Sequence, residues 1–352
     1  MRAQAYVLQK PGSPLVRESL DLGEPARGQV IVEVLACGLC HTDLAFADGS
    51  VAPRHALPLV LGHEVVGRVC SAGEGAEGLV GRDVLVPSVM SCWDCAFCRA
   101  GRSNACPRQL MPGNDIHGGF ATHMVAPAHA LVSLDGLPTS VKLDSLSVVA
   151  DAVSTAYQAV RRSGLERGDF AYVVGAGGVG GFVAQIARAL GAHVLVCDVS
   201  DARLASARAL GADRAVNVAG REPRELRKEL QAAAAEFRVP SLGWRVFECS
   251  GTTAGQTLAY SLVGAASTLV VTGYTRETVS LRLSNLMAFD ATAHGTWGAP
   301  ADAYPGVLEL IAKGAIQIEP VIERAPMSRL VELMGALARH ELDKRMVLDP
   351  KA

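Results

Sequence analysis

The first third of the chain alternates short apolar runs with polar and turn-forming residues. Val-rich runs bounded by Gly and Pro occupy residues 30–35, 64–69 and 83–86. Runs of this length and composition predict β-strands. Their even spacing indicates that the first domain is a partly antiparallel barrel.

From about Leu143 the apolar pattern changes to alternating helical and strand-like segments. A helix is predicted over Leu143–Arg162, ended by Gly164. Further helices are predicted up to residues 190, 210, 237 and 263, between strands at 170–174, 193–198, 215–218, 245–248 and 268–272. Such alternation is typical of βαβ units around a parallel sheet. Two helical segments and a last strand at 345–348 are expected in the tail, which should return to the first domain.

Composition narrows the class of protein. The chain has 352 residues, of which 49% are hydrophobic and 19% charged, so we expect a globular protein of two domains. With a net charge of −2, the chain lacks the excess of basic residues that is typical of nucleic-acid-binding proteins. No apolar run approaches the roughly 20 residues of a membrane span, and the N-terminus lacks a cleavable apolar segment. With nine cysteines in a long chain, these features favour a cytoplasmic protein whose thiols bind metal.

A glycine-rich turn predicts a nucleotide site. Val173–Val174 leads into Gly175-Ala176-Gly177-Gly178-Val179-Gly180, and a helical pattern follows. Glycine permits the close approach of a pyrophosphate, and the helix N-terminus supplies amide donors. Asp198 ends the next predicted strand, where its carboxylate would bond the ribose hydroxyls of NAD and repel the extra phosphate of NADP. The alternative, a glycine-rich turn with a surface Asp, is disfavoured by the strand–turn–helix context.

Four cysteines form a separate cluster in the sequence. Cys92, Cys95, Cys98 and Cys106 lie in one short loop, where four thiolates can close a structural, tetrahedral Zn²⁺ site. A disulfide pair and an iron–sulfur cluster are the alternatives. The expected cytoplasmic setting disfavours the first, and the second lacks other redox features in this chain.

A reactive metal site is predicted around Cys40 and His63. Catalytic zinc needs three protein ligands and one exchangeable position, and both residues lie in an apolar, glycine-rich stretch. Cys37 and Cys40 form a Cys-x-x-Cys pair, so a redox dithiol is the competing interpretation, although the pair lies outside the βαβ region. From residue types and spacing, the chain is expected to bind zinc and NAD, as a dehydrogenase does.

The motifs together carry a family resemblance over essentially the whole chain. Cys40-His41-Thr42-Asp43, Gly62-His63-Glu64, the four-cysteine loop and the glycine turn resemble, in order and spacing, the medium-chain zinc-containing alcohol dehydrogenases. This resemblance implies an α/β protein. A GroES-like, partly antiparallel β-barrel catalytic domain is expected at 1–152 and 295–352, and a Rossmann doubly wound parallel sheet for NAD at 153–294.

The resemblance also implies site roles. Asp151 would be the third ligand of the catalytic zinc, Glu64 the acid beside the metal, Asp43 the carboxylate that orients the ligand histidine, and Thr42 the hydroxyl that receives the alcohol's proton. With the four-cysteine site, two Zn²⁺ per chain are expected. Further contacts to the cofactor are expected from His41, Arg203, Gly273, Tyr274 and Arg345. Ala45 replaces the relay histidine of liver- and yeast-type members, so water, a ribose hydroxyl or another side chain such as His55 must complete the proton path.

Residues 111–120, with Asp151, resemble a narrower subgroup. Its members oxidise alicyclic hydroxyacyl-CoA thioesters such as 6-hydroxycyclohex-1-ene-1-carbonyl-CoA in anaerobic benzoyl-CoA degradation, and water addition to the enone product would also suit the metal. The candidates to hold CoA are Arg54, Arg102, Arg108 and Arg282, although surface solvation is the simpler explanation for any one of them. The candidates to line the pocket are Phe46, Trp93, Leu286 and Trp297, although large apolar residues more often pack in a core or a domain interface. The alternatives are a polyol or simple secondary-alcohol dehydrogenase, a zinc hydratase or hydrolase, and a non-catalytic nucleotide-binding relative.

The resemblance implies a homo-oligomer that acts on a small molecule. Family members form dimers and tetramers, and a tetramer is favoured here. An edge strand near Leu281–Leu283 is expected to pair across a two-fold axis.

Overall fold

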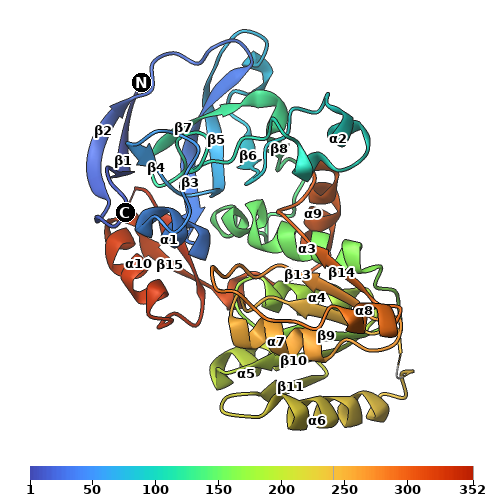
Figure 1. Cartoon of the computed structure of the whole chain (residues 1–352). Coiled ribbons are helices and arrows are strands. Elements are labelled where there is room, and N and C mark those ends of the chain that lie inside the picture. Colours follow the sequence, from blue (N-terminus) through green and yellow to red (C-terminus); the bar gives the residue numbers. More distant parts are fainter. Residues whose placement is uncertain (241, 352) are drawn as a thin grey trace. The chain divides into compact units, whose positions relative to one another are not determined.

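The computed structural model describes residues 1–240 and 242–351. Two compact units are present (Figure 1), one made of residues 1–154, 298–312 and 322–352 and the other of residues 155–297 and 313–321. Each unit has its own sheet and its own apolar core. Within the described ranges, every helix is too short or too polar to cross a membrane.

The first unit is a mostly antiparallel β-structure. A three-stranded sheet has the order β2-β1-β4, and a larger sheet has the order β15-β16-β3-β5-β6-β8, with β7 also paired to β3. Only β15 and β16 run parallel among these pairs. The bounds are β1 (Arg2–Leu8), β2 (Val16–Asp21), β3 (Gln29–Gly38), β4 (Leu59–Val60), β5 (Glu64–Ala72), β6 (Asp83–Val86), β7 (His123–Pro127), β8 (Val132–Ser133), β15 (Ile322–Pro326) and β16 (Arg345–Asp349).

Helices of this unit are short. They are α1 (His41–Asp48), α2 (Ala96–Arg99), α9 (Tyr304–Ala312) and α10 (Leu330–Ala338), with 3₁₀ turns at Glu77–Leu79, Ser103–Ala105, Ala128–Ala130, Asp144–Ala150, Ala301–Ala303 and Met327–Arg329. The predicted strands at 30–35, 64–69, 83–86 and 345–348 all fall within observed strands. Together with the sheet order, they confirm the partly antiparallel barrel.

Pairing of β3 with β5 brings two predicted metal ligands to one end of the larger sheet. Gly38, the last residue of β3, is the register partner of Glu64, the first residue of β5. Cys40 follows Gly38 by two residues and His63 precedes Glu64 by one. Because the strands are antiparallel, the two side chains come from the same edge although 23 positions separate them in the sequence.

The predicted helix over 143–162 is wrong as a single element. A 3₁₀ segment covers Asp144–Ala150, and α3 (Ala152–Ser163) begins after a break at Asp151, whose φ and ψ are −135° and −69°. Hydrogen bonds to residues distant in the sequence stabilise this interruption of the helix. The carbonyl of Ala150 accepts from Tyr304 Oη (3.0 Å) and from the backbone N–H of Ser88 (3.1 Å). The N–H of Ala152 donates to Glu64 Oε1 (3.2 Å), so both flanking groups are bonded outside the helix.

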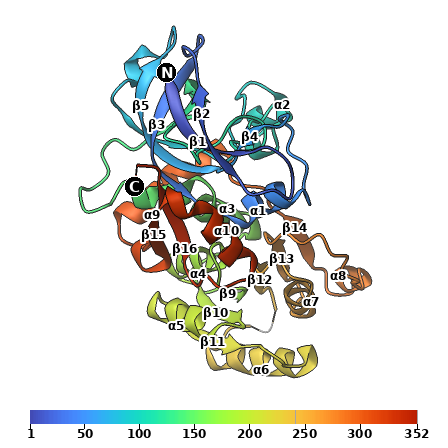
Figure 2. The same ribbon diagram turned by 90° about the vertical axis from the view of Figure 1, so that its left-hand side faces the viewer.

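The second unit contains a six-stranded parallel sheet with the order β11-β10-β9-β12-β13-β14 (Figures 1 and 2). The strands are β9 (Phe170–Val174), β10 (His193–Asp198), β11 (Arg214–Asn217), β12 (Arg245–Glu248), β13 (Thr268–Val271) and β14 (Thr292–Gly295). Between them lie α4 (Gly180–Ala189), α5 (Asp201–Ala209), α6 (Pro223–Glu236), α7 (Thr253–Ser261) and α8 (Ser284–Ala288), and a 3₁₀ turn covers Glu319–Val321. The doubly wound sheet predicted from the alternating pattern is confirmed.

Register shows which residues share the carboxyl edge of this sheet. Cys197, Val174, Glu248, Val271 and Gly295 are partners in one row across five strands. The chain order reverses between β9 and β12, and α/β sheets bind ligands outside their carboxyl ends at such a reversal. Residues one position later, or in the turns that follow, are therefore the ones placed to meet a nucleotide.

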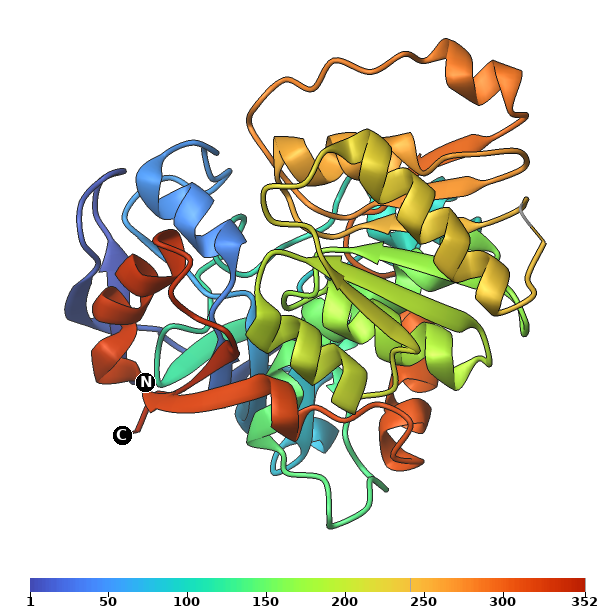
Figure 3. The same ribbon diagram turned by 90° about the horizontal axis from the view of Figure 1, so that it is seen from below.

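Residues 272–291 form a long excursion that carries α8. Figures 2 and 3 show this orange segment extending away from the strands of its own unit and returning to β14. Leu281–Leu283 lies in this excursion and in no strand, so the edge strand predicted there is wrong. The edge of the sheet is β14, which pairs with β13 on one side.

Candidate metal centres and nucleotide cradle

Four side chains of the first unit converge on one point. Cys40, His63, Glu64 and Asp151 each present one ligand atom, and these atoms lie within 4.8 Å of one another. Cys40 is the residue before α1, His63 and Glu64 begin β5, and Asp151 occupies the break before α3. The structure thus brings together the residues predicted for the catalytic metal.

Asp43 fixes the orientation of the His63 ring. Its Oδ1 lies 3.2 Å from His63 Nδ1 and also accepts the backbone N–H of Gly62 (3.1 Å), while Oδ2 accepts the N–H of Cys40 (3.0 Å). The carboxylate therefore ties both ligand segments to the first turn of α1. Metal-binding histidines commonly have their second nitrogen held in this way.

The other ring nitrogen of His63 fits a metal. Nε2 is buried, forms no hydrogen bond with a described residue, and lies 3.5 Å from Asp151 Oδ2. Asp151 Oδ2 is 3.9 Å from Cys40 Sγ. Sulfur, nitrogen and oxygen ligands around a tetrahedral Zn²⁺ at 2.0–2.3 Å stand about 3.4–3.7 Å apart, close to these separations.

Electrostatics also favour a cation at this point. Burial alone lowers the pKa of His63, but the Asp43 and Asp151 carboxylates outweigh it and hold the pKa well above the usual value. A ring surrounded by two carboxylates and a thiol attracts positive charge, whether a proton or a divalent metal. The donor set of sulfur, imidazole and carboxylate suits Zn²⁺.

Ser88 is a partner of Asp151 that the sequence did not reveal. Its Oγ donates to Asp151 Oδ1 at 3.5 Å, while Oδ2 faces Cys40 and His63. Ser88 follows β6 and forms no motif with Asp151. No spacing signal relates two residues 63 positions apart, so only the folded chain identifies this contact.

Glu64 belongs to the same group but is held by Arg345. The Glu64 side chain is fully buried, and both of its oxygens accept from the guanidinium of Arg345, with Nε to Oε2 at 2.8 Å and Nη2 to Oε1. Burial raises the pKa of Glu64 and the guanidinium opposes that rise only in part. For Arg345, burial lowers the pKa, but the Glu64 carboxylate outweighs burial and holds the pKa well above the usual value.

Thr42 and Cys37 lie on either side of the Cys40 thiol in sequence but differ in environment. Thr42 Oγ1 is 3.7 Å from Cys40 Sγ, next to the group of ligands. Cys37 is fully buried in the core, where burial raises the pKa of its thiol, and its Sγ faces the carbonyl of Gly38. Cys37 is not in the group of possible metal ligands that contains Cys40, and its burial and raised pKa disfavour the thiolate that a redox dithiol needs.

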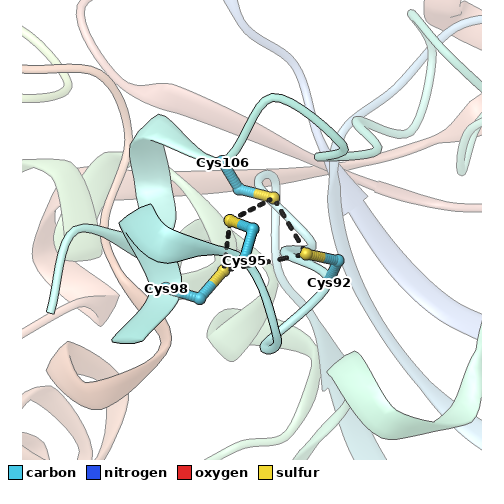
Figure 4. Close-up of side chains that lie close together, drawn as sticks. All are labelled: Cys92, Cys95, Cys98 and Cys106. Carbon is cyan, nitrogen blue, oxygen red and sulfur yellow. Dashed lines mark hydrogen bonds between the residues drawn. The ribbon is translucent and has the colours of Figure 1, made fainter. Parts of the chain in front are cut away.

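The four-cysteine loop forms a second cluster (Figure 4). Its sulfur atoms are 3.4 Å (Cys92–Cys106), 3.5 Å (Cys95–Cys98), 3.8 Å (Cys95–Cys106) and 3.9 Å (Cys92–Cys98) apart. Zn–S bonds of about 2.3 Å in a tetrahedron put sulfurs about 3.8 Å apart. All four cysteines are free thiols. The backbone N–H of Cys98 lowers the pKa of Cys95 to about 7, whereas burial raises the pKa of Cys98 and raises that of Cys106 to about 11. Cys95 is therefore the most readily ionised of these three thiols.

The glycine turn and Asp198 lie side by side at the carboxyl edge of the second unit. A Cβ on Gly175 would lie 2.7 Å from the N of Ser250, and one on Gly180 would overlap the carbonyl of Gly175, so neither position has room for a side chain. Helix α4 begins at Gly180, with its N-terminus at the turn. Asp198 Oδ2 accepts the N–H of Ala176 (2.6 Å), which ties β10 to the turn.

The second unit is thus built as a phosphate and ribose cradle of the Rossmann type.

Comparisons with known proteins agree with the architecture of both units. Residues 26–136 match the alcohol dehydrogenase GroES-like domain, and residues 178–313 match the zinc-binding dehydrogenase family. The 2-dehydro-3-deoxy-L-galactonate 5-dehydrogenase of Pseudoalteromonas atlantica is 30% identical over 315 residues, which cover 89% of this chain and 88% of the relative. The chain belongs to the zinc-type medium-chain alcohol dehydrogenases.

Other relatives of this family are similar along their whole length. An alcohol dehydrogenase of Geobacillus stearothermophilus is 29% identical over 343 residues, which cover 95% of this chain and 97% of the relative. The alcohol dehydrogenase of the hyperthermophilic archaeon Aeropyrum pernix has a crystal structure that superposes with a TM-score of 0.87. It is 28% identical, and the match covers 99% of this chain and 100% of that chain.

Some residues that the family resemblance assigned to the cofactor contact other residues of this chain. His41 opens α1 and its ring stacks on His340 at 5.9 Å between centroids. Arg345 is occupied by Glu64. In the second unit, Gly273 and Tyr274 follow β13. The backbone N–H of Arg203 in α5 donates to Ser200 Oγ (3.3 Å), the residue that caps this helix.

The residues suggested for the substrate pocket and for CoA belong to both units and differ in burial. Phe46 is buried in the core of the first unit, whereas Trp93 and Trp297 are exposed and Leu286 packs against the core of the second. Among the suggested arginines, Arg54 pairs with Asp115, Arg108 with Asp94, and Arg282 Nε donates to Ser284 Oγ. Arg54 and Arg108 are therefore each paired with a nearby acidic residue of the chain.

Proposed function

We propose that this chain catalyses the zinc-dependent, NAD-linked oxidation of a secondary alcohol to a ketone. The observation that carries the proposal is the group formed by Cys40, His63 and Asp151, in which the buried His63 Nε2 lies 3.5 Å from Asp151 Oδ2 and has no hydrogen bond among the described residues. Three protein ligands of this kind leave a fourth position for substrate, as a catalytic zinc requires. The four-cysteine loop would hold a second, structural zinc.

Zinc at the first centre would act as a Lewis acid and lower the pKa of the substrate hydroxyl. Thr42, beside Cys40, is the residue we assign to accept the hydroxyl proton. Asp43 and Ser88 orient His63 and Asp151, and Arg345 keeps the Glu64 carboxylate in place next to them. Beyond Thr42 the relay differs from that of relatives with a histidine at Ala45. His55 Nδ1 already faces the Ala56 carbonyl at 2.5 Å, which favours water or a ribose hydroxyl as the next group.

We propose NAD rather than NADP as the cofactor. Asp198 ends β10 beside the glycine turn, and a carboxylate there bonds two ribose hydroxyls but repels a phosphate. We assign cofactor contacts in the second unit to Gly175, Gly177, Gly178, Val179, Gly180, Arg203, Gly273 and Tyr274. In the first unit we assign them to His41 and Arg345. We also propose the functional division made from the sequence, with the catalytic domain at 1–152 and 295–352 and the NAD domain at 153–294.

The substrate we favour is a polyol, sugar acid or simple secondary alcohol. The relatives named above are alcohol dehydrogenases and a dehydro-deoxy-galactonate dehydrogenase, which act on hydroxyl groups of small molecules by their names. The finer hypothesis is 6-hydroxycyclohex-1-ene-1-carbonyl-CoA, with water addition as an accompanying reaction. It rests on residues 111–120 and Asp151 alone, and the local pairing of Arg54 and Arg108 weakens it.

A substrate screen tests the proposal. Purified enzyme is assayed for NADH formation with simple secondary alcohols, sugar acids and polyols, and hydroxyacyl-CoA thioesters, with metal content measured on the same sample. Turnover of an alcohol or sugar acid with about two zinc per chain supports it. Binding of NAD without turnover of any class would favour the non-catalytic relative, and hydration without NADH formation would favour the hydratase. Turnover confined to the thioester would establish the finer hypothesis.

We further propose a homo-oligomer, with a tetramer favoured. The excursion at 272–291 exposes large apolar side chains, with Leu283 68% and Met287 78% exposed, and it leads directly into the edge strand β14. Light scattering during size-exclusion chromatography should give four times the chain mass of 36.8 kDa. A mass equal to one chain would refute it.

A further inference from the structure

Glu248 is a buried carboxylate at the carboxyl edge of the nucleotide sheet that no proposed contact explains. It is the last residue of β12, next to the point where the strand order reverses, and it is fully buried. Buried carboxylates are costly unless they are bonded. The hydrogen bonds of Glu248 therefore indicate what a carboxylate contributes to the structure at this position.

One oxygen of Glu248 gathers three donors from the following turn. Oε1 accepts the N–H of Ser250 (2.8 Å), the Oγ–H of Ser250 (2.6 Å) and the N–H of Gly251 (3.1 Å). A carboxylate bonded in this way closes the turn from Glu248 to Gly251 on itself. The turn is thereby fixed by the side chain and not only by its own backbone.

The backbone of Glu248 holds the end of the neighbouring strand. Its carbonyl accepts from the N–H of Thr272 (2.9 Å), the Oγ–H of Thr272 (2.9 Å) and the N–H of Gly273 (3.2 Å). Through one residue, the turn after β12 and the turn after β13 are therefore cross-linked.

The two turns touch each other at glycines. A Cβ on Gly273 would overlap the N of Gly251 and lie 2.6 Å from Glu248 Oε2, and one on Gly251, whose φ is +65°, would lie 2.7 Å from the carbonyl of Tyr274. Glu248 Oε2 itself has no hydrogen-bond partner among the described residues. An unsatisfied buried acceptor costs stability, and such groups concentrate at functional sites.

The location of these turns indicates which half of a dinucleotide they meet. A dinucleotide lies across the reversal of strand order, with one half on each side. The glycine turn after β9 takes the pyrophosphate and Asp198 on β10 takes the adenosine ribose, as proposed above. Strands β12 and β13 lie on the other side of the reversal, so their turns face the nicotinamide half.

We propose that Glu248 is a positioning residue that fixes the turns 249–251 and 272–274 for the nicotinamide half of the coenzyme. This rests on the proposed NAD-linked function. Removing the carboxylate frees the turn 249–251, against which the turn 272–274 packs at Gly251 and Gly273, while the backbone carbonyl of residue 248 still holds Thr272. The nicotinamide half must then order the turn 249–251 on binding, so affinity falls. The adenosine half, held by Asp198 and the glycine turn, is unaffected.

The experiment compares two ligands, NADH and ADP-ribose, which lacks the nicotinamide. Dissociation constants are measured by calorimetry for the wild type, Glu248→Leu and Glu248→Gln. For Glu248→Leu we expect the constant for NADH to rise roughly 10- to 100-fold, the range of one or two charge-assisted hydrogen bonds, while that for ADP-ribose changes less than about threefold. Glu248→Gln keeps a carbonyl acceptor for the Ser250 donors and should restore most of the affinity for NADH.

Two further variants separate positioning from general damage to the fold. Asp169→Asn makes the same charge change at the amino edge of the same sheet, just before β9. There Asp169 Oδ2 accepts the N–H of Glu166 and pairs with Arg245 Nε (3.3 Å), at the opposite end of β12 from Glu248. This variant should leave both constants unchanged. Ser250→Ala removes one donor to Glu248 and should weaken NADH selectively by about two- to fivefold, which keeps the proposal testable if Glu248→Leu does not fold.

The outcomes distinguish the two levels of inference. Wild-type protein that binds neither ligand refutes the proposed NAD-linked function. Wild-type protein that binds both, with variants that weaken NADH and ADP-ribose equally or not at all, refutes the role of Glu248 and leaves the NAD-linked function standing. Selective loss of NADH affinity supports the role of Glu248.

Discussion

Replacement of Arg345 by methionine tests the ion pair that joins the last strand to the metal centre. The Arg345 side chain is 8% exposed and the Glu64 side chain is fully buried, so water cannot solvate the carboxylate once the guanidinium is gone. Breaking a buried pair from one side costs about 3–5 kcal/mol. For a domain of 150–250 residues, each kcal/mol lowers the melting temperature by about 2–4 °C, which gives a fall of roughly 6–20 °C.

The loss should depend on pH in a definite direction. Burial already raises the pKa of Glu64, and Arg345 is the largest influence that opposes this rise, so removing Arg345 raises the pKa further. The native variant then binds a proton that the unfolded chain releases at lower pH, so its stability falls as pH rises through the raised pKa. Arg345→Met should therefore be more damaging at pH 8 than at pH 5. In Arg345→Met/Glu64→Gln no buried carboxylate remains unpaired, and part of the stability should return.

Differential scanning calorimetry at the two pH values measures this, with metal content determined in every sample so that metal loss is recognised. Arg68→Met is the matched control, because Arg68 pairs with Asp83 in the same unit but is 50% exposed. Exposed pairs contribute at most about 1 kcal/mol. Equal losses of stability in the two arginine variants would contradict the role of the buried pair. So would a melting temperature of Arg345→Met equal to that of the wild type at pH 8 with unchanged metal content.

Three other predictions follow from the site. Cys98→Ser should lower the zinc content from about two to about one per chain by mass spectrometry of metals, and unchanged content would contradict the structural site. Thr42→Ala should lower kcat by about 100-fold or more with normal zinc content, whereas Thr42→Ser should keep most activity; wild-type turnover in Thr42→Ala would remove Thr42 from the mechanism. Asp198→Ala should raise KM for NAD about tenfold or more and reduce the preference over NADP, and an unchanged ratio of kcat/KM for the two cofactors would argue against the ribose contact.

Local signals account for most of the elements. The Val-rich runs predicted β3, β5 and β6, and alternating segments predicted β9 to β13 within one or two residues at each end. Strand preference and the strand–turn–helix of a glycine motif are decided by neighbouring residues, so a short window of sequence contains them. The edge strand near Leu281–Leu283 was wrong because it came from the family pattern and not from a local signal.

Long-range contacts explain the larger failure. The pattern over Leu143–Arg162 is helical throughout, yet the helix breaks at Asp151 because Ala150 and Ala152 are bonded by Tyr304, Ser88 and Glu64. None of those partners lies within 60 residues of the break. Tertiary hydrogen bonds of this kind override local helix propensity, which contributes less than about 1 kcal/mol per residue.

By itself the sequence determined that this protein has a nucleotide-binding α/β sheet, a four-cysteine metal loop and a thiol–imidazole pair suited to zinc. Those features consist of residues close together in the chain, and their chemistry depends on type and spacing. The tertiary structure decided that Asp151 turns toward Cys40 and His63, that Ser88 holds it there, and that Arg345 binds Glu64 across 281 positions. Such contacts depend on how strands pair and where a helix is interrupted, and those outcomes are set by the packing of the whole unit.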